Sequence, residues 1–220
     1  MEKIMEYQPE IWISIGQTFI MVGISVLAAV IIGLPLGTYL YLSRKGNLYE
    51  NRWLFAVLDT FVNIVRSFPF LLLVVFLIPF TRLIVGTAIG TMAATVPLSI
   101  ISIAYYARLV EQSLLDVPKS IIEAAISMGA SRTQIIFKFL YREARSGLIF
   151  GLTTATVSFI SYSTIMGMVG GGGVGDFAIR YGYQRYETEL MAYTIILMVI
   201  LVQAIQVTGT RIAKKLDKRS

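Results

Sequence analysis

Long apolar stretches separated by short polar ones run along the whole chain. Ile11–Ser43 and Leu83–Ala107 carry no charged residue, and each exceeds the ~20 residues that an α-helix needs to cross a bilayer. Phe61–Thr81 is interrupted only by Arg66, whose long side chain can snorkel to the membrane surface. The pattern predicts an all-α membrane protein, one domain over 1–220, with five spans at about 11–42, 60–81, 83–107, 147–169 and 190–210.

Glycine and proline interrupt these spans at defined places. Gly33, Pro35 and Gly37 are expected to bend the first helix near one end. Pro79 and Gly86 mark the turn between the second and third spans.

A polar island, Ser120–Gly147, lies in the loop predicted over 108–146. Ser120 and Glu123 have the spacing of a capping box, in which two side chains satisfy backbone N–H groups at a helix start. Ser131 and Gln134 repeat this spacing. The island therefore predicts two short helices.

Gly129 lies between these helices, where the first one needs a residue that tolerates the left-handed conformation. The first helix is predicted from about Ile121 to Met128, which is too short to be stable alone in water. We therefore expect its apolar residues to pack against another surface. These residues are Ile121, Ile122, Ile126 and Met128.

Composition favours a lipid environment. Of 220 residues, 56% are hydrophobic and only 15% are charged, whereas a soluble domain has roughly a quarter of its residues charged. The chain has no cysteine, which excludes disulfides and thiolate metal sites, and no histidine, the commonest general base and metal ligand. We therefore expect no metal site and no catalytic residues.

The net charge of +6 could indicate binding to nucleic acid, or it could reflect cytoplasmic loops of a membrane protein. The positions of the basic residues distinguish these two interpretations. If the polar island is cytoplasmic, fifteen of the nineteen basic residues share its side. They are Arg44, Lys45, Arg52, Arg66, the six from Arg108 to Arg145 and the five from Arg211 onward. Because cytoplasmic loops are enriched in Lys and Arg, we predict that the N-terminus is outside and the C-terminus inside.

Two motifs suggest other functions. The spacing Ala125-x3-Gly129-x5-Ile135 fits a DNA-binding helix-turn-helix, but a loop tethered to the bilayer at both ends is not free to lie along DNA. The glycine run formally matches the dinucleotide motif G-x-G-x-x-G, yet it follows a membrane helix rather than a strand. We interpret it as a flexible external loop that includes Gly170, Gly172, Gly173 and Gly175.

The segment Glu123-Ala124-Ala125-x3-Gly129 resembles the EAA loop of ABC-importer permeases. The family pattern ends in Leu-Pro, where this chain has Tyr141-Arg142. Further segments are similar to the permeases of bacterial methionine importers: Arg66-Ser67-Phe68-Pro69-Phe70, Ile78-Pro79-Phe80-Thr81-Arg82, Ile84-Val85-Gly86-Thr87, and Tyr162-Ser163 before the glycines.

This resemblance implies a type I importer permease in the bacterial inner membrane. Such a permease is a homodimer, binds two copies of a cytoplasmic ATPase subunit and receives methionine from an external binding lipoprotein. ATP and Mg²⁺ would be held by the ATPase, since no G-x4-G-K-[ST] loop occurs in this chain, and no cofactor is expected here. No nucleic-acid partner is expected.

The resemblance also implies which residues carry the function. The segment that docks on the ATPase would be Ser120, Ile121, Ile122, Glu123, Ala124, Ala125, Met128, Gly129 and Ala130. The candidates for the translocation path or gate are Arg66, Ser67, Pro69, Ser161, Tyr162, Ser163 and Met166.

Three alternatives remain open at this point. The same machinery could import another small solute. An autonomous channel or secondary transporter would need no ATPase, but an exposed apolar docking helix argues against it. An intramembrane enzyme is the weakest of the three, because the chain lacks histidine, cysteine and a paired-acid site.

Overall fold

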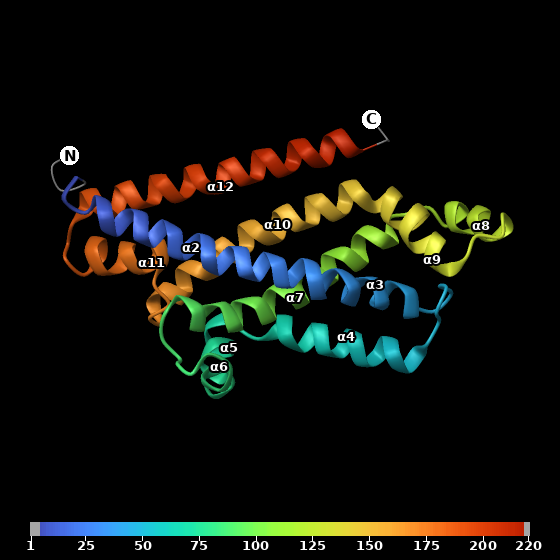
Figure 1. The fold of residues 1–220 in the computed structure, drawn as a ribbon, viewed down its shortest axis with the longest axis horizontal. Coiled ribbons are helices and arrows are strands. Elements are labelled where there is room, and N and C mark those ends of the chain that lie inside the picture. The colour runs from blue at the N-terminus through green and yellow to red at the C-terminus, as the bar shows by residue number, and fades with distance from the viewer. Residues whose placement is uncertain (1–4, 218–220) are drawn as a thin grey trace.

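The computed structural model describes residues 5–217, and most of them lie in helices that run lengthwise along the molecule (Figure 1). The helices in order are α2 (Gln8–Ala28), η1 (Ala29–Gly33), α3 (Leu34–Ser43), α4 (Arg52–Ser67), α5 (Phe70–Phe76), α6 (Ile78–Val85), α7 (Thr91–Leu115), α8 (Lys119–Ser127), α9 (Arg132–Gln134), η2 (Ile135–Leu140), α10 (Tyr141–Met168), α11 (Gly173–Phe177), η3 (Ala178–Tyr183) and α12 (Thr188–Leu216).

The first predicted span is one long helix in which α2, η1 and α3 follow one another without a break. This helix contains one π-helical turn, η1, which ends at Gly33. The irregular turn therefore lies next to the glycines and the proline that predicted a bend. A Cβ atom added at Gly37 would lie only 2.2 Å from the carbonyl oxygen of Ala107 on α7. Glycine at this position therefore allows α3 and α7 to cross at close range.

The second predicted span differs from the structure. We expected one helix over 60–81, but α4 ends at Ser67 and the axis of α5 is turned by 104° from that of α4. Phe68 has an extended backbone, as expected for a residue before proline, and Pro69 precedes α5. The third helix begins at Thr91 rather than near Leu83, because α6 and a loop lie between.

Helix α7 occupies the centre of the molecule. It packs against α2, α3, α4 and α10, and it is more buried than any other candidate span among residues 5–217. Leu98, Ala104 and Val110 on this helix are completely buried. The core of the described chain is therefore built around α7.

Among residues 5–217, four continuous helical segments are long and apolar enough to cross a membrane, or five if the bent pair of α4 and α5 counts as one span. Only 11% of the apolar window of α12 and 28% of that of the long first helix, Gln8–Ser43, is buried within the chain. Most apolar side chains on these helices therefore face outward, as expected for helices that contact lipid or another chain.

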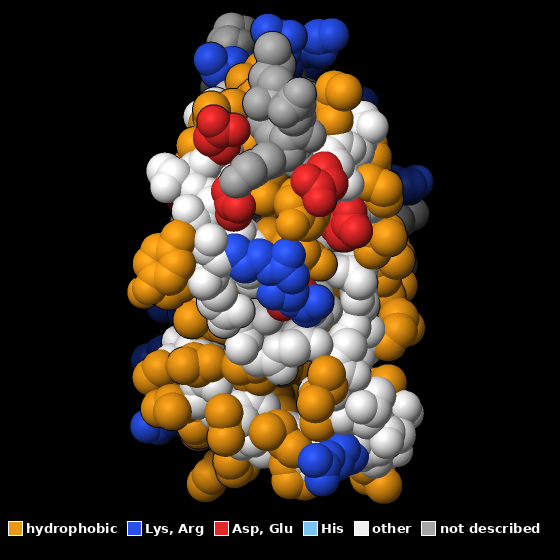
Figure 2. Space-filling model, turned by 90° about the vertical axis from the view of Figure 1, so that its left-hand side faces the viewer, with side chains coloured by type: hydrophobic (Ala, Val, Ile, Leu, Met, Phe, Trp, Pro, Cys, Tyr) orange, Lys and Arg blue, Asp and Glu red, His pale blue; other side chains and the backbone are white. Residues whose placement is uncertain are grey.

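The helix directions place different segments at the two ends of the molecule (Figure 1). The α3–α4 loop, α8 and α9 lie at one end, and α11 and η3 lie at the other with the start of α2. Figure 2 faces the second end, where Lys and Arg side chains gather near the middle of the face and Asp and Glu side chains lie mostly above them. The α3–α4 loop, α8 and α9, which are predicted to be cytoplasmic, thus share one end of the fold. Arg66 was predicted on the same side but lies in the last turn of α4, next to the bend and away from this end.

Candidate functional site

Helix α8 carries the EAA segment, and its start differs from the prediction. The helix begins at Lys119 after Pro118, so Ser120 lies inside the first turn and does not cap it. The predicted capping box of Ser120 and Glu123 is therefore wrong. A proline that precedes the first helical residue sets the start of the helix two positions earlier than the S-x-x-E spacing indicates.

The end of α8 agrees with the prediction. Gly129 has φ of +74°, its N–H donates to the carbonyl of Ile126 at 2.9 Å, and the N–H of Ala130 donates to the carbonyl of Ala125 at 3.1 Å. These two bonds form a Schellman motif, which ends a helix by satisfying its last carbonyl groups. The role of Gly129 as a left-handed helix terminator is confirmed.

The second capping box is also confirmed. The N–H of Ser131 donates to Oε1 of Gln134 at 2.9 Å, and the N–H of Gln134 donates to Oγ of Ser131 at 3.4 Å. The helix that begins there is not short, however. It passes from α9 through the π-helical turn η2 into α10, so that one helical segment covers Arg132–Met168.

The surface of α8 divides into a buried side and an exposed side. Ala125 is completely buried, and Ile122 packs against the core of its own chain. Ile126 and Met128 remain 52% and 68% exposed. We call the exposed residues of the helix and its cap the α8 outer face: Lys119, Ser120, Glu123, Ala124, Ile126, Ser127 and Met128.

A cavity of about 200 Å³ lies beside this outer face. It is lined by the α3–α4 loop and by Lys119, Ile122, Glu123 and Ile126 of α8. The outer face therefore combines exposed apolar side chains with a recess, which is a surface suited to receiving another protein.

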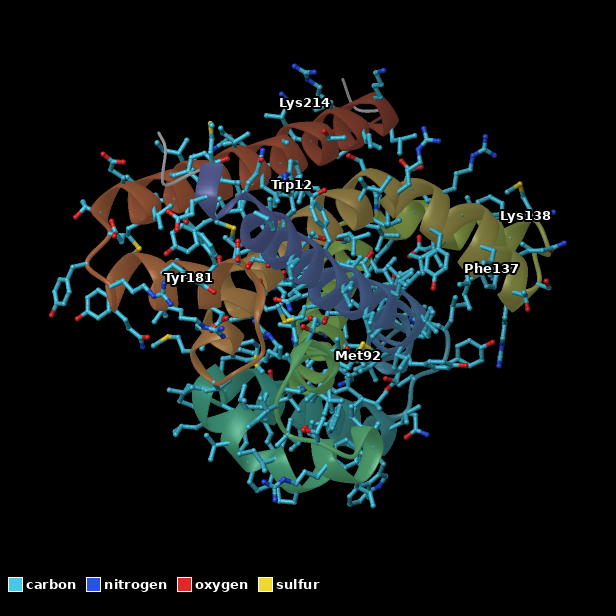
Figure 3. All side chains as sticks on the ribbon, turned by 60° about the vertical axis from the view of Figure 1, so that its left-hand side comes forward. Trp12, Met92, Phe137, Lys138, Tyr181 and Lys214 are labelled. Carbon is cyan, nitrogen blue, oxygen red and sulfur yellow. The ribbon has the colours of Figure 1, made fainter. Side chains whose placement is uncertain are left out.

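Aromatic contacts hold this end of the chain together. The guanidinium of Arg132 lies 4.9 Å from the ring centre of Tyr49, and the hydroxyls of Tyr141 and Thr38 are 2.7 Å apart. Phe137 packs edge to face on Tyr141 and, with Lys138, projects from the end that carries α8 and α9 (Figure 3). Tyr141, which replaces the family leucine, thus links the loop to the first span.

A group of charged residues that the sequence reasoning missed lies between α3, α4 and α7. Arg108 donates to Oδ1 of Asp59 at 2.7 Å, to Oδ1 of Asn63 at 2.8 Å and to Glu111. Arg44 also donates to Glu111, at 3.4 Å. We call these five residues the Arg108 cluster. The sequence indicates only two parts of this cluster, because two pairs of its residues have the spacing of neighbours on a helix. These pairs are Asp59 with Asn63 and Arg108 with Glu111.

Two of the predicted pathway residues, Arg66 and Tyr162, each contact an aromatic ring of a neighbouring helix. The guanidinium of Arg66 lies 5.9 Å from the ring centre of Tyr105 on α7. Tyr162 on α10 packs against Phe70 at 4.7 Å between ring centres. Residues of α4, α5, α7 and α10 thus converge near the bend after α4.

Ser67 and Pro69 line a cavity of about 550 Å³ at the bend between α4 and α5. Its other lining residues are Thr60, Asn63, Ile64, Phe68 and Leu72.

The remaining pathway candidates, Ser161, Ser163 and Met166, lie on α10 together with Tyr162. Ser161 is exposed, whereas Ser163 and Met166 are buried inside the chain. The hydroxyl of Ser163 donates to the carbonyl of Ile160 at 2.7 Å. The seven candidates therefore do not form one continuous surface within a single chain.

The glycine run is less loop-like than expected. Only 169–172 lie outside a helix, because Gly173 and Gly175 belong to α11 and are buried. The N–H of Gly173 donates to Oε1 of Gln17 at 2.7 Å, and the N–H of Val174 donates to Oγ1 of Thr18 at 2.9 Å. The expectation of a flexible loop over this whole run is thus corrected, because α2 holds the start of α11.

An ion pair follows the glycine run. Arg180 donates to Oδ2 of Asp176 at 2.6 Å, and this hydrogen bond raises the pKa of Arg180 above its ordinary value.

Comparison with known proteins gives consistent results. Residues 29–220 match the family described as "Binding-protein-dependent transport system inner membrane component". The probable D-methionine transport system permease protein MetI of Vibrio cholerae is 48% identical over 203 residues, covering 92% of this chain and 90% of the relative. The methionine import system permease protein MetP of Bacillus subtilis is 42% identical over 180 residues, covering 82% and 81%.

Solved structures agree with this result over nearly the whole chain. An inward-facing crystal form of the MetNI methionine ABC transporter superposes with a TM-score of 0.94 at 39% identity, covering 97% of this chain and 99% of that one. A crystal structure of an amino acid ABC transporter shares the fold, with a TM-score of 0.74 at 17% identity. The chain therefore belongs to the family of inner-membrane components of binding-protein-dependent transport systems.

Proposed function

We propose that this chain is the permease subunit of an ATP-driven importer for methionine. The observation that carries the proposal is its likeness, over nearly its full length, to a permease chain of the MetNI methionine transporter and to curated permeases named for D-methionine or methionine. The fold is consistent with such a subunit, since it has helices long enough to span a membrane, a cavity at the bend between α4 and α5, and a short helix with an exposed side.

The α8 outer face is the proposed contact with a cytoplasmic ATPase subunit. A two-turn helix fixed at its end by a Schellman motif presents Ile126 and Met128 to solvent at the end rich in basic residues. Apolar side chains exposed in this way are stabilised when a partner covers them. The proposed orientation, with the N-terminus outside and the C-terminus inside, places this face in the cytoplasm.

Two copies of the chain are proposed to form the translocation path. Four or five spans are too few to enclose a polar path alone, whereas a two-fold dimer doubles them and places the path at the interface. The exposed sides of α4 and α5, with the cavity at their bend, suit this position. An external binding lipoprotein would deliver methionine at the end that carries α11 and η3.

Hydrolysis of ATP is assigned to the partner subunit, because the chain contains no phosphate-binding loop of the G-x4-G-K-[ST] type. ATP and Mg²⁺ are therefore expected on that subunit.

Purification from membranes in mild detergent tests the proposal. The chain alone should show no ATPase activity, and it should co-purify with an ATPase subunit in a one-to-one ratio. Hydrolysis by that complex should rise with methionine-loaded binding protein and not with the protein loaded with another amino acid. Hydrolysis by the contaminant-free chain, or an absence of any stoichiometric ATPase, would contradict the proposal.

A further inference from the structure

The Arg108 cluster joins α4 to α7 through Arg108, and it joins the end of α3 to α7 through Arg44 and Glu111. Arg108 lies on α7 and donates to two acceptors on α4, at 2.7 Å to Asp59 and 2.8 Å to Asn63. It also pairs with Glu111 on its own helix, and Glu111 accepts from Arg44 just after α3. Removal of Arg108 would therefore disconnect both α4 acceptors from α7.

Apolar packing holds α4 along one side only. Val62 and Val65 are its buried side chains, Phe55 and Leu58 pack against the same core partly buried, and its main neighbours in the described chain are α3 and α7. Figure 1 shows α4 along one edge of the molecule. Because apolar contacts are non-directional, the hydrogen bonds from Arg108 add the directional contacts between α4 and α7.

The buried charges of the cluster favour one position of α4 on α7. Glu111 is 1% exposed, and the side chain of Arg108 is 15% exposed. Hydrogen bonds that involve a charged group are shorter and stronger than those between neutral groups. Movement of α4 relative to α7 would break the two hydrogen bonds from Arg108 to Asp59 and Asn63 and leave Arg108 paired only with Glu111 on its own helix. The cluster therefore favours motion of the two helices as one unit.

The cluster lies between the two candidate sites. Helix α7 ends at Leu115, and α8 begins at Lys119, so α7 leads almost directly into the proposed docking helix. Helix α4 ends at Ser67, which lines the 550 Å³ cavity at the bend. Asn63 belongs to both the cluster and the cavity lining.

We infer that Arg108 is a positioning residue that makes α4 move together with α7 and α8. Displacement of α8 by an ATPase subunit would then reach the cavity at the α4–α5 bend. This inference rests on the proposed function and adds the residues that transmit the motion.

The test uses the complete transporter in proteoliposomes, with its ATPase and binding protein, and measures methionine imported per ATP hydrolysed. Asp59→Asn keeps the size of the side chain and one acceptor oxygen but removes the charge. The ratio should fall by about fivefold or more, the low end of coupling between two sites. Asp59→Glu, which restores the carboxylate, should recover at least half of the parental ratio.

Glu50→Gln is the matched control. It also removes a carboxylate at the same end of the molecule, but Glu50 is exposed and accepts a bond from the N–H of Gly46 in its own loop. This variant should keep the parental ratio. A loss of ratio in Glu50→Gln as large as that in Asp59→Asn would overturn the inference, because the effect would then be one of charge alone.

The remaining outcomes are also decisive. If Asp59→Asn imports as much methionine per ATP as the unchanged transporter, the inference is overturned, even if less complex assembles. The cluster would then contribute to stability only. If Asp59→Asn does not assemble at all, Arg108→Lys decides, because lysine keeps the positive charge but lacks the planar fork that bonds Asp59 and Asn63 together. An unchanged ratio in Arg108→Lys overturns the inference, and a fall of about fivefold or more supports it. If the transporter without substitutions assembles but imports no methionine, both this inference and the proposed function are wrong.

Discussion

Single residues with strong local preferences are where sequence and structure agree best. Gly129 has a positive φ, and Ser131 and Gln134 cap each other, as their types and spacing predict. Both devices depend on neighbours within a few residues, so the local sequence contains the necessary information. The Ser120 prediction failed for an equally local reason, because Pro118 begins the helix earlier.

The conformation of Gly129 leads to a specific prediction. Gly129→Val should abolish transport while the chain still reaches the membrane, because a β-branched residue is strongly disfavoured at φ of +74°. A Cβ atom there would meet no atom within 4 Å, so the cost comes from the backbone, at about 1–3 kcal/mol, and not from a clash.

Gly129→Asn is the matched control, because asparagine tolerates the left-handed region better than other residues. Methionine uptake and substrate-stimulated ATPase activity should be retained in this variant and lost in Gly129→Val. Normal uptake by an assembled Gly129→Val complex would show that the geometry of the α8 end does not matter for coupling.

Helices and their breaks were only partly predictable. Helix α4 with α5 has the composition of one span, yet Pro69 and the extended Phe68 divide it with a turn of 104°. Conversely, the predicted second helix of the polar island is continuous with α10, because no proline occupies position 142 and the chain continues through a π-helical turn. Residue types indicate where a break is permitted, whereas packing decides how far the chain turns.

Contacts between helices lay beyond sequence reasoning. Asp59 and Arg108 are far apart in the chain, and nothing in the local pattern pairs them. The same holds for the crossing of α3 and α7 at Gly37, where the sequence shows only a glycine in an apolar run. A single sequence contains no direct signal for such pairs.

The crossing of α3 and α7 can be tested by adding one methyl group. Gly37→Ala places a carbon within 2.2 Å of a backbone oxygen, so the helices must separate, at a cost of about 1–3 kcal/mol. Gly23→Ala is the control, since a Cβ atom there meets nothing within 4 Å. Thermal unfolding in detergent should show a lower midpoint for Gly37→Ala and no decrease for Gly23→Ala. Equal midpoints would mean that the crossing is not tightly packed.

The whole molecule has two distinct ends, which agrees with the charge asymmetry of the sequence. The α3–α4 loop, α8 and α9 carry four of the basic residues that the sequence assigns to the cytoplasm, and the last turn of α12 adds Lys214 and Lys215. The four are Arg44, Lys45, Lys119 and Arg132. In Figure 3, Lys138 and Tyr181 lie toward opposite ends. The proposed orientation in the membrane rests on this asymmetry and the positive-inside rule.

Cysteine labelling tests the orientation in a chain that has no cysteine of its own. Ser131 and Thr188 are both exposed, and they lie in segments at opposite ends of the fold. An impermeant thiol reagent should label Ser131→Cys only after the cells are opened, and it should label Thr188→Cys in intact cells whose outer layer is permeable. The reverse pattern would invert the topology.

The most direct test of the proposed function is methionine uptake into proteoliposomes that contain the purified chain, its ATPase subunit and methionine-loaded binding protein. With ATP on the side of the ATPase, labelled methionine should accumulate against its gradient. Uptake should stop with a non-hydrolysable ATP analogue, and unlabelled methionine should compete better than other amino acids. Accumulation without ATP hydrolysis, or no accumulation of methionine by an assembled and hydrolysing complex, would contradict the assignment of this chain as a methionine-import permease.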